Sequence, residues 1–386
     1  DRDMENQLLD SMDLEKERGI TIKAHPVTMY YTAADGVEYE LNLIDTPGHV
    51  DFSYEVSRSL SACEGALLIV DAAQGVEAQT VANVNLAINQ KLAIIPVINK
   101  IDLPHADVDG VKRQLEEILA IPADDAVLAS AKEGIGTEEV LEAIVRLVPQ
   151  PRTTSTPSLQ ALVFDSYFDS YQGVVPMVRV FNGQIQAGMS VKMLHSDKTI
   201  EVKEVGSFNP KPYKRDALTA GETGYLSANI KSPSDVKMGD TLTEPRNPSG
   251  PLPGFKELKP MVFSGIYPIN PADHEHLKDN LAKLQLNDSA FFYQAESSVA
   301  LGFGFRCGFL GLLHLEIVQE RLRREFNMDI IATYPSVVYK VLTTKGEEMD
   351  IDNPVYLPEQ NFIATISEPM VRAYIMCPNE YIGDLM

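Results

Sequence analysis

Cysteine is scarce in this sequence. Its 386 residues include only Cys63, Cys307 and Cys377, and none of these forms a Cys-x-x-Cys pair. Structural zinc sites and disulfide frameworks need several cysteines at characteristic spacings. The scarcity argues against both and predicts a reducing, cytoplasmic setting.

Long apolar runs and positive charge are also missing. No apolar run approaches the ~20 residues that a membrane-spanning helix needs. The formal net charge is −22, which excludes a general nucleic-acid binder, although a local basic patch could still meet RNA. The sequence opens on Asp1 rather than on Met, so we expect that its true N-terminus is missing.

The first 150 residues alternate between two patterns. Buried-strand patterns, rich in Ile, Val and Leu, occupy 39–45, 65–72 and 92–100. Amphipathic helical patterns occupy 51–63, 77–90 and 108–121. This alternation predicts an α/β domain with a mostly parallel sheet and helices on both faces. Ligands of such sheets bind at the carboxyl ends of the strands.

The pattern changes after a Pro/Ser/Thr-rich linker at 149–158. Residues 159–250 show short strand patterns with Gly turns and predict a small antiparallel β-barrel. Beyond a second linker at 248–255, the order βαββαβ predicts an α+β, ferredoxin-like domain. The last residues look like the start of a further α+β domain that is cut off. We therefore divide this multidomain chain into 1–150, 159–250, 256–342 and 366–386.

One strand end has the chemistry to recognise a purine base. Asn99-Lys100-Ile101-Asp102 follows an apolar strand, and Ser130-Ala131-Lys132 follows the weak strand pattern 126–130. A carboxylate at Asp102 can accept paired hydrogen bonds from the ring N–H and exocyclic amine of guanine. Adenine offers no such pair and would be rejected about 10⁴-fold by analogy with other buried polar sites. The methylenes of Lys100 can lie over the base, and Ser130–Lys132 can offer a backbone N–H to its carbonyl.

A second strand end suits a phosphate and a cation. Asp45 ends the strand 39–45, and Gly48 lacks a side chain, so its backbone N–H can approach a terminal phosphate. Thr21 lies in a segment that could carry a hydroxyl to a magnesium ion. Asp-x-x-Gly alone is weak, because a strand-end turn explains it equally well. Its occurrence before Asn-Lys-x-Asp and Ser-Ala-Lys, each at a strand end, is a strong signal.

Together these segments resemble the G motifs of the translational GTPases, the ribosome-dependent factors that include elongation factors Tu and G. The residues that carry the resemblance are Arg18-Gly19-Ile20-Thr21, Asp45-Thr46-Pro47-Gly48-His49, Asn99-Lys100-Ile101-Asp102 and Ser130-Ala131-Lys132. The predicted order of domains is also that of the family. Residues 103–129 leave no room for the insert of elongation factor G. The segment 367–384 resembles the start of that factor's last domain, yet it closely follows the predicted ferredoxin-like domain, so the long decoding-centre domain is absent from between them.

The resemblance implies a role for each residue. Thr21 would coordinate Mg²⁺ in the GTP state, Asp45 would hold it through water, and the Gly48 N–H would sense the γ-phosphate. His49 would orient the attacking water when ribosomal RNA pushes it into place. Loss of the γ-phosphate contacts would release these segments and make a switch. The family binds guanine with Asn99, Lys100, Ile101 and Asp102, helped by Ser130, Ala131 and Lys132.

The resemblance further implies a GTP hydrolase, a cytoplasmic translation factor that acts on the elongating ribosome in fidelity or back-translocation. Its cofactors would be GTP or GDP and Mg²⁺. Its partners would be ribosomal RNA and proteins and ribosome-bound tRNA, with no DNA, and the protein would be a monomer. Peripheral association with the cytoplasmic face of the cell membrane is implied by family resemblance alone.

One expected motif does not occur in the sequence. The phosphate cradle G-x-x-x-x-G-K-[ST] is absent, and its nearest spacing match, Gly183 to Gly188, continues with Met189. In the family the cradle and its strand precede the segment that opens this sequence. We therefore expect an incomplete G domain at 1–150 that binds GTP weakly or not at all. A non-catalytic ribosome-binding fragment is accordingly the alternative function.

Two features outside these motifs remain open. Arg321, Arg323 and Arg324 form either a small RNA-facing patch or the charged face of a helix. Cys307, between Arg306 and Gly308, is either a packed strand residue, which we favour, or a reactive thiol.

Overall fold

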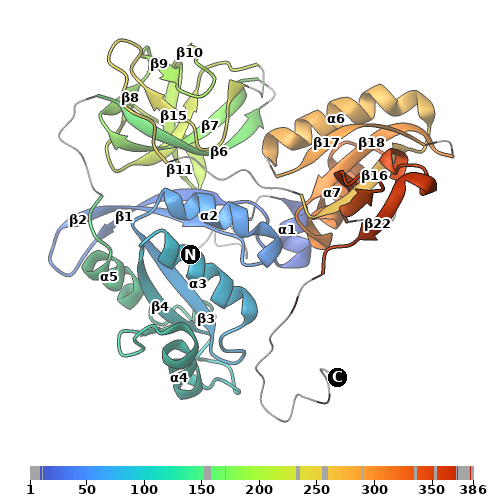
Figure 1. Ribbon diagram of the computed structural model, residues 1–386. Coiled ribbons are helices and arrows are strands. Elements are labelled where there is room, and N and C mark those ends of the chain that lie inside the picture. Colours follow the sequence, from blue (N-terminus) through green and yellow to red (C-terminus); the bar gives the residue numbers. More distant parts are fainter. Residues whose placement is uncertain are drawn as a thin grey trace. The chain divides into compact units, whose positions relative to one another are not determined.

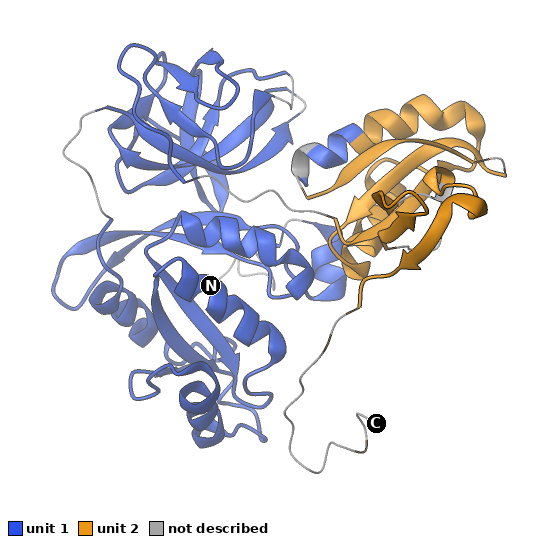
Figure 2. Cartoon of the chain, viewed as in Figure 1, with its two compact units in different colours: residues 1–258, 282–289 blue, residues 259–281, 290–386 orange. Residues whose placement is uncertain are grey.

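The computed structural model describes two compact units (Figures 1 and 2). The first comprises residues 1–258 with 282–289, and the second 259–281 with 290–386. Within them the described residues are 9–10, 12–151, 158–169, 171–231, 235–253, 260–288, 290–298, 300–333, 337–351, 354–370, 372 and 383. No helix in these ranges is both long and apolar enough to cross a membrane.

A three-stranded parallel sheet lies at the centre of residues 65–147. Its order is β3 (Gly65–Asp71), β4 (Ala93–Asn99), β5 (Val127–Leu128). The helices around it are α2 (Ser53–Ser61), α3 (Ala78–Asn89), α4 (Val108–Leu119) and α5 (Thr137–Leu147). Ile98 of β4 packs with α4, whereas its neighbour Val97 packs with α5. Because successive strand residues point to opposite faces, helices cover both sides of the sheet, as the sequence predicts.

The strand at 39–45 departs from the prediction. It is β2 (Glu38–Asp45), and it pairs antiparallel with β1 (His25–Thr32), a strand that sequence reasoning missed. A tight turn explains the pairing, since the Ala33 N–H donates to the Val37 carbonyl at 3.0 Å and Gly36 has a φ of 79°. β2 therefore belongs to a half-buried hairpin and not to the parallel sheet. Two short helices flank the hairpin, α1 (Asp13–Arg18) and the 3₁₀ turn η1 (Val50–Phe52).

Residues 160–243 form a strongly curved antiparallel sheet in the same unit. Its order is β10-β9-β15-β6-β7-β14-β11-β12, with a separate pair β13-β8. Val191 of β9 and Val205 of β11, from opposite ends of this order, are buried in one apolar cluster, so the sheet wraps around a single core. The strands are β6 (Gln160–Asp169), β7 (Gly173–Asn182), β8 (Gln184–Gln186), β9 (Ser190–Met193), β10 (Thr199–Glu201), β11 (Glu204–Asn209), β12 (Lys211–Arg215), β13 (Ala217–Thr219), β14 (Thr223–Ser227) and β15 (Thr241–Thr243).

The second unit begins with a four-stranded antiparallel sheet of order β17-β18-β16-β19. Along the chain its elements follow the order βαββαβ. They are β16 (Val262–Pro268), η3 (Pro271–Asp273), α6 (His274–Asn287), β17 (Phe292–Ser298), β18 (Gly302–Phe309), α7 (Leu312–Glu325) and β19 (Ile330–Ala332). The strand predicted across 329–341 is wrong in its extent, because β19 ends at Ala332 and another strand begins at Tyr339.

That next strand belongs to a second sheet, of order β21-β20-β22, which the sequence did not predict. Its elements are β20 (Tyr339–Thr343), β21 (Glu348–Ile351), η4 (Pro354–Tyr356), η5 (Gln360–Phe362) and β22 (Ile363–Ser367). The further domain predicted at 366–386 lies mostly outside the described residues. The domain boundaries at 150, 159, 250 and 342 stay predictions.

Candidate functional site

The two predicted base-binding segments contact each other. The Ala131 N–H donates to the side-chain oxygen of Asn99 at 3.1 Å, and the Ser130 hydroxyl donates to Asp102 Oδ1 at 2.7 Å. Ser130 is fully buried, whereas Asp102 is exposed. The structure therefore joins Asn99 to Ala131 and the exposed Asp102 to Ser130.

Lys100 adopts a strained conformation at this position. Its φ is 63°, in the left-handed region that side-chain-bearing residues rarely occupy. Its Nζ lies 2.8 Å from Asp71 Oδ2, at the end of the neighbouring strand β3. The side chain is thereby directed across the strand ends, where a cavity of about 220 Å³ is lined by Asp71, Asn99 and Lys100 among others. Backbone strain of this kind concentrates at functional positions.

Asp71 is a site residue that sequence reasoning missed. Burial alone would raise the pKa of its carboxyl, but Lys100 and the backbone N–H groups of Ala73 and Gln74 together hold that pKa below its usual value. Asp71 therefore stays ionised and anchors Lys100. Its signal was available, because an aspartate follows the apolar residues of the strand pattern 65–72 just as one follows those of 39–45.

The two predicted cation ligands both lie near an acidic residue that the sequence did not single out, Asp10. The Thr21 hydroxyl donates to Asp10 Oδ1 at 3.0 Å, and Asp10 is buried. Burial raises the pKa of the Asp45 carboxyl, and the charges of Asp10 and Glu15 raise it further, while His25 lowers it. Thr21 and Asp45 are thus both neighbours of Asp10, in a place where negative charge is concentrated and only partly compensated.

This donor set fits magnesium. A hydroxyl and carboxylates are hard oxygen ligands, and Mg²⁺ is typically held by one or two carboxylates with waters and phosphate oxygens. In the described ranges no group of three or more His, Cys, Asp or Glu residues forms a complete metal cage. A cation there would offset the repulsion from Asp10 and Glu15 that adds to the effect of burial on the pKa of Asp45.

Glu15 fixes the Thr21 segment. It is fully buried, and its Oε1 accepts the backbone N–H of Ile22 at 2.9 Å and that of Lys23 at 3.1 Å. Its Oε2 accepts the Met12 N–H at 2.9 Å, so the same side chain also satisfies a backbone donor at the start of α1. Sequence reasoning missed Glu15 and Asp10, because both lie in a polar segment with no apolar period.

Gly48 has a free approach to its backbone. A Cβ there would meet no atom within 4 Å, and its φ is not positive, so neither packing nor backbone conformation requires glycine. The space beside its backbone is therefore open, as the predicted approach of a phosphate to the Gly48 N–H requires. The Gly48 carbonyl accepts a hydrogen bond from Asn83 of α3 at 3.3 Å, which ties this segment to the helix.

His49 is held by its own turn. It is the N-cap of η1, and its Nδ1 accepts the Asp51 N–H at 3.1 Å. Its ring also meets Phe52 edge to face, with 6.4 Å between centroids. Since Nδ1 accepts, the neutral ring carries its proton on Nε2. In this arrangement Nε2 can donate a hydrogen bond to a water molecule but cannot take a proton from it.

The two features left open by the sequence have plain structural explanations. Arg321 forms a bidentate pair with Glu325 on α7, and Arg323 and Arg324 both pair with Glu320. The three arginines thus pair with two glutamates of their own helix, which favours the charged-face interpretation. Cys307 is fully buried in β18, as expected for a packed strand residue.

Comparison with known proteins points to one family. The family described as the elongation factor Tu GTP binding domain matches residues 1–150, and elongation factor Tu domain 2 matches 173–243. All 386 residues align at 58% identity with elongation factor 4 of Protochlamydia amoebophila (strain UWE25). The identity is 57% to elongation factor 4 of Bacillus cereus (strain ATCC 10987 / NRS 248) and 56% to that of Bacillus thuringiensis subsp. konkukian (strain 97-27).

In each comparison the chain spans 64% of the relative's length. The two family matches fall on the parallel-sheet region and on the curved antiparallel sheet, in the order that the sequence predicts. With the G motifs described above, the chain is similar to the translational GTPases, through the elongation factor Tu GTP binding domain at 1–150 and through elongation factor 4 over all 386 residues.

Proposed function

We propose that this chain is the greater part of a ribosome-dependent GTPase, a translation factor that hydrolyses GTP to GDP on the elongating ribosome, in a fidelity or back-translocation role. The observation that carries the proposal is the joining of Asn99 to Ala131 and of Asp102 to Ser130. These contacts bring two distant motifs together at one sheet edge. The similarity to the elongation factor Tu GTP binding domain and the alignment of all 386 residues with elongation factor 4 support the same function.

Guanine recognition is assigned to the joined segments. Asp102, oriented by Ser130, accepts the two N–H groups of guanine through its exposed carboxylate. Lys100 covers the base with its methylenes while Asp71 anchors its ammonium group. Asn99 fixes the Ser130–Lys132 loop, whose backbone N–H groups face the guanine carbonyl, and Ile101 spaces Lys100 from Asp102. A base without the paired donors leaves Asp102 without partners and is rejected.

Phosphate and cation binding are assigned to the end of the hairpin and to the Thr21 segment. Mg²⁺ bound there supplies charge neutralisation for the phosphates. Thr21 contributes its hydroxyl, Asp45 its carboxylate through water, and the Gly48 N–H meets the γ-phosphate. When that phosphate is lost, the contacts of Thr21 and Gly48 are lost with it, and both segments are free to move.

His49 is assigned the positioning of the attacking water. With the proton on Nε2, the ring donates a hydrogen bond to the water oxygen and so orients it toward the phosphate. Its N-cap contact to Asp51 holds the ring near the surface until a partner redirects it. Water positioning of this kind is the main requirement of phosphoryl transfer on a protein.

The remaining assignments rest on the family. We assign ribosomal RNA and proteins and ribosome-bound tRNA as partners, a monomeric state, and a cytoplasmic location with peripheral membrane association left to experiment. The β16–β19 sheet is assigned to the ferredoxin-like class, which its βαββαβ order and its strand order β17-β18-β16-β19 support.

The test measures GTP turnover by the full-length protein, with and without 70S ribosomes. We expect strong stimulation by ribosomes and a loss of about 100-fold in stimulated turnover in His49→Ala, with little change in KM. His195→Ala, at an exposed histidine of the curved sheet, is the matched control. Absence of stimulation in the wild type would overturn the proposed function. Ribosome binding with no turnover would favour the non-catalytic alternative.

A further inference from the structure

Strand β2 is attached to the curved antiparallel sheet along one face. Its alternate residues Glu40, Asn42 and Ile44 all contact that sheet, as the two-residue period of a strand requires. Ile44 packs in an apolar cluster with Phe164 of β6 and Met177 of β7. The strand therefore carries one apolar and two polar attachments in succession, and it ends at Asp45.

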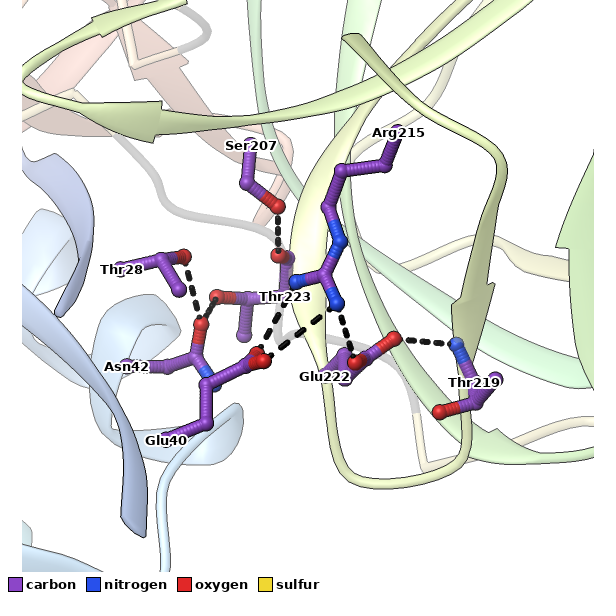
Figure 3. A network of polar contacts seen from close by, with 8 residues as sticks. All are labelled: Thr28, Glu40, Asn42, Ser207, Arg215, Thr219, Glu222 and Thr223. Atoms are coloured by element: carbon purple, nitrogen blue, oxygen red, sulfur yellow. Dashed lines mark hydrogen bonds and ion pairs between the residues drawn. The ribbon is translucent and has the colours of Figure 1, made fainter. Parts of the chain in front are cut away.

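Asn42 forms the central attachment (Figure 3). Its side-chain oxygen accepts the Thr28 hydroxyl at 2.8 Å and the Thr223 hydroxyl at 3.1 Å. Thr28 lies directly opposite Asn42 in the β1–β2 hairpin, and Thr223 begins β14. One amide oxygen thus joins the two hairpin strands to a strand of the curved sheet. Thr28 and Thr223 are both buried, so neither hydroxyl has ready access to water as a substitute partner.

Arg215 forms the second polar attachment. Its Nη1 and Nη2 donate to the two carboxylate oxygens of Glu40 at 3.0 and 3.3 Å, and Nη2 also donates to Glu222 at 2.7 Å. Figure 3 shows the guanidinium between the two carboxylates. Bidentate pairs of this kind fix geometry as well as contributing energy. Side-chain exposures of 17–22% leave the bridge partly screened by solvent.

We propose that Asn42 and the Glu40–Arg215–Glu222 bridge are positioning residues that couple the curved sheet to the Asp45–His49 segment. Asn42 precedes Asp45 by three residues of extended strand, about 10 Å. If β12 or β14 shifts, the attached strand β2 shifts with it. Asp45, at the end of β2, then moves, and with it the segment that holds Gly48 and His49. The role of residues 45–49 in phosphate binding rests on the proposed function, whereas their attachment to the curved sheet does not.

The chemistry of these contacts indicates that they fix the position of β2 relative to the curved sheet and do not merely hold the two together. An apolar contact tolerates sliding, whereas a bidentate guanidinium and an amide oxygen with two donors each define one register. The opposite face of β2 carries Leu41, Leu43 and Asp45, and Leu43 is 36% exposed, so that face holds the strand less firmly. The attachments to the curved sheet therefore help to fix the position of Asp45, together with its pairing partner His25 in β1.

Hydrogen–deuterium exchange on the 386-residue chain tests the proposal without nucleotide or ribosome. In Arg215→Met and in Asn42→Ala we expect amides in 40–49 to exchange about tenfold faster than in the wild type, because the local opening becomes easier. Amides of β4 and β7 should keep their rates. Lys214→Met is the matched control, because Lys214 neighbours Arg215 on β12 but pairs with Glu204 of the curved sheet itself.

Unchanged exchange in 40–49 would overturn the proposal. An equal increase across the whole unit would also overturn it, since that indicates general destabilisation rather than positioning. Should Arg215→Met fail to fold, Glu222→Gln keeps the volume and weakens the bridge, and the same local increase is expected. If ribosomes do not stimulate the wild-type protein, the proposed function fails, whereas the exchange result still decides whether the curved sheet positions the segment.

Discussion

The hydroxyl of Ser130 donates to Asp102 at 2.7 Å across 28 residues of sequence. The same oxygen accepts the Glu133 N–H at 3.3 Å, so a single buried side chain holds both the carboxylate and its own loop. We expect Ser130→Ala to lower the free energy of unfolding by about 1 kcal/mol, because a buried donor is lost while exposed Asp102 can rehydrate. Urea denaturation followed by circular dichroism measures this loss.

The same substitution should weaken guanine-nucleotide binding by the full-length protein several-fold, because Asp102 is no longer oriented. Ser61→Ala is the matched control, since the Ser61 hydroxyl bonds only within its own helix, to the Arg58 carbonyl at 2.6 Å. Titration with a fluorescent GTP analogue compares the two variants. Equal affinities in both would show that Ser130 does not orient Asp102.

Arg179 joins the parallel-sheet region to the curved sheet. From β7 it donates to both carboxylate oxygens of Glu64, at 2.7 and 3.2 Å, and to the Ala62 carbonyl at 3.0 Å, with only 3% of the residue exposed. Removing Arg179 leaves the Ala62 carbonyl and Glu64 without this partner, although the Glu64 side chain is 21% exposed and can partly rehydrate. We expect Arg179→Met to cost about 2–3 kcal/mol in the free energy of unfolding.

The control for this prediction is Lys203→Met, which removes an ion pair between two exposed side chains, Lys203 and Glu201. That change should shift stability by less than about 1 kcal/mol. Urea midpoints of the two variants make the comparison. Similar small shifts in both would mean that the Arg179 contacts contribute no more than surface charges do.

The parallel sheet and its helices could be predicted because their signals are local. The runs at 65–72 and 92–100 are apolar on both faces, and the helical patterns between them have a clear 3.6-residue period. The hairpin could not be placed in the same way. β2 has apolar residues that favour burial, but its pairing with β1 depends on the turn at Gly36 and on packing against the curved sheet. Pairing of that kind is a tertiary property.

Short strands of the curved sheet were missed for the same reason. β12 reads Lys-Pro-Tyr-Lys-Arg, a composition typical of a loop, and it forms a strand because β11 supplies its backbone partners. In the site, the motifs led directly to Asn99, Asp102 and Ser130. Asp10 and Glu15 have no comparable pattern, and only the folded chain brings them beside Thr21 and Asp45.

The buried carboxyl of Glu55 should make the free energy of unfolding depend on pH. It is buried on α2, and burial, followed by the charge of Asp165, raises the pKa of its carboxyl from 4.5 to about 7, although Arg58 and Lys23 act in the opposite direction. The folded state therefore binds this proton more tightly than the unfolded state. The contribution of Glu55 to the free energy of unfolding is therefore fully present below pH 4.5, and it is lost as the pH rises through about 7.

Glu55→Gln mimics the protonated form at every pH. Urea midpoints at pH 5, 6, 7 and 8 should fall with pH in the wild type and change less in the variant. Above pH 7 the variant should be more stable by about 1–3 kcal/mol. Glu133→Gln, at an exposed side chain, should follow the wild-type profile. A wild-type slope that survives in Glu55→Gln would assign the pH dependence to another group.

The described cysteines should be inert in the folded protein. Burial raises the pKa of the Cys63 thiol to about 12, and it raises that of Cys307 well above its ordinary value. Since the thiolate is the reactive form, both should resist alkylation at pH 8. We expect iodoacetamide to modify them at least about 100-fold faster in 8 M urea than in native buffer, because unfolding restores both exposure and the ordinary pKa. Peptide mapping by mass spectrometry scores each thiol separately and keeps Cys377, which lies outside the described residues, out of the comparison. Rapid native modification of the Cys307 peptide would restore the reactive-thiol interpretation that its burial argues against.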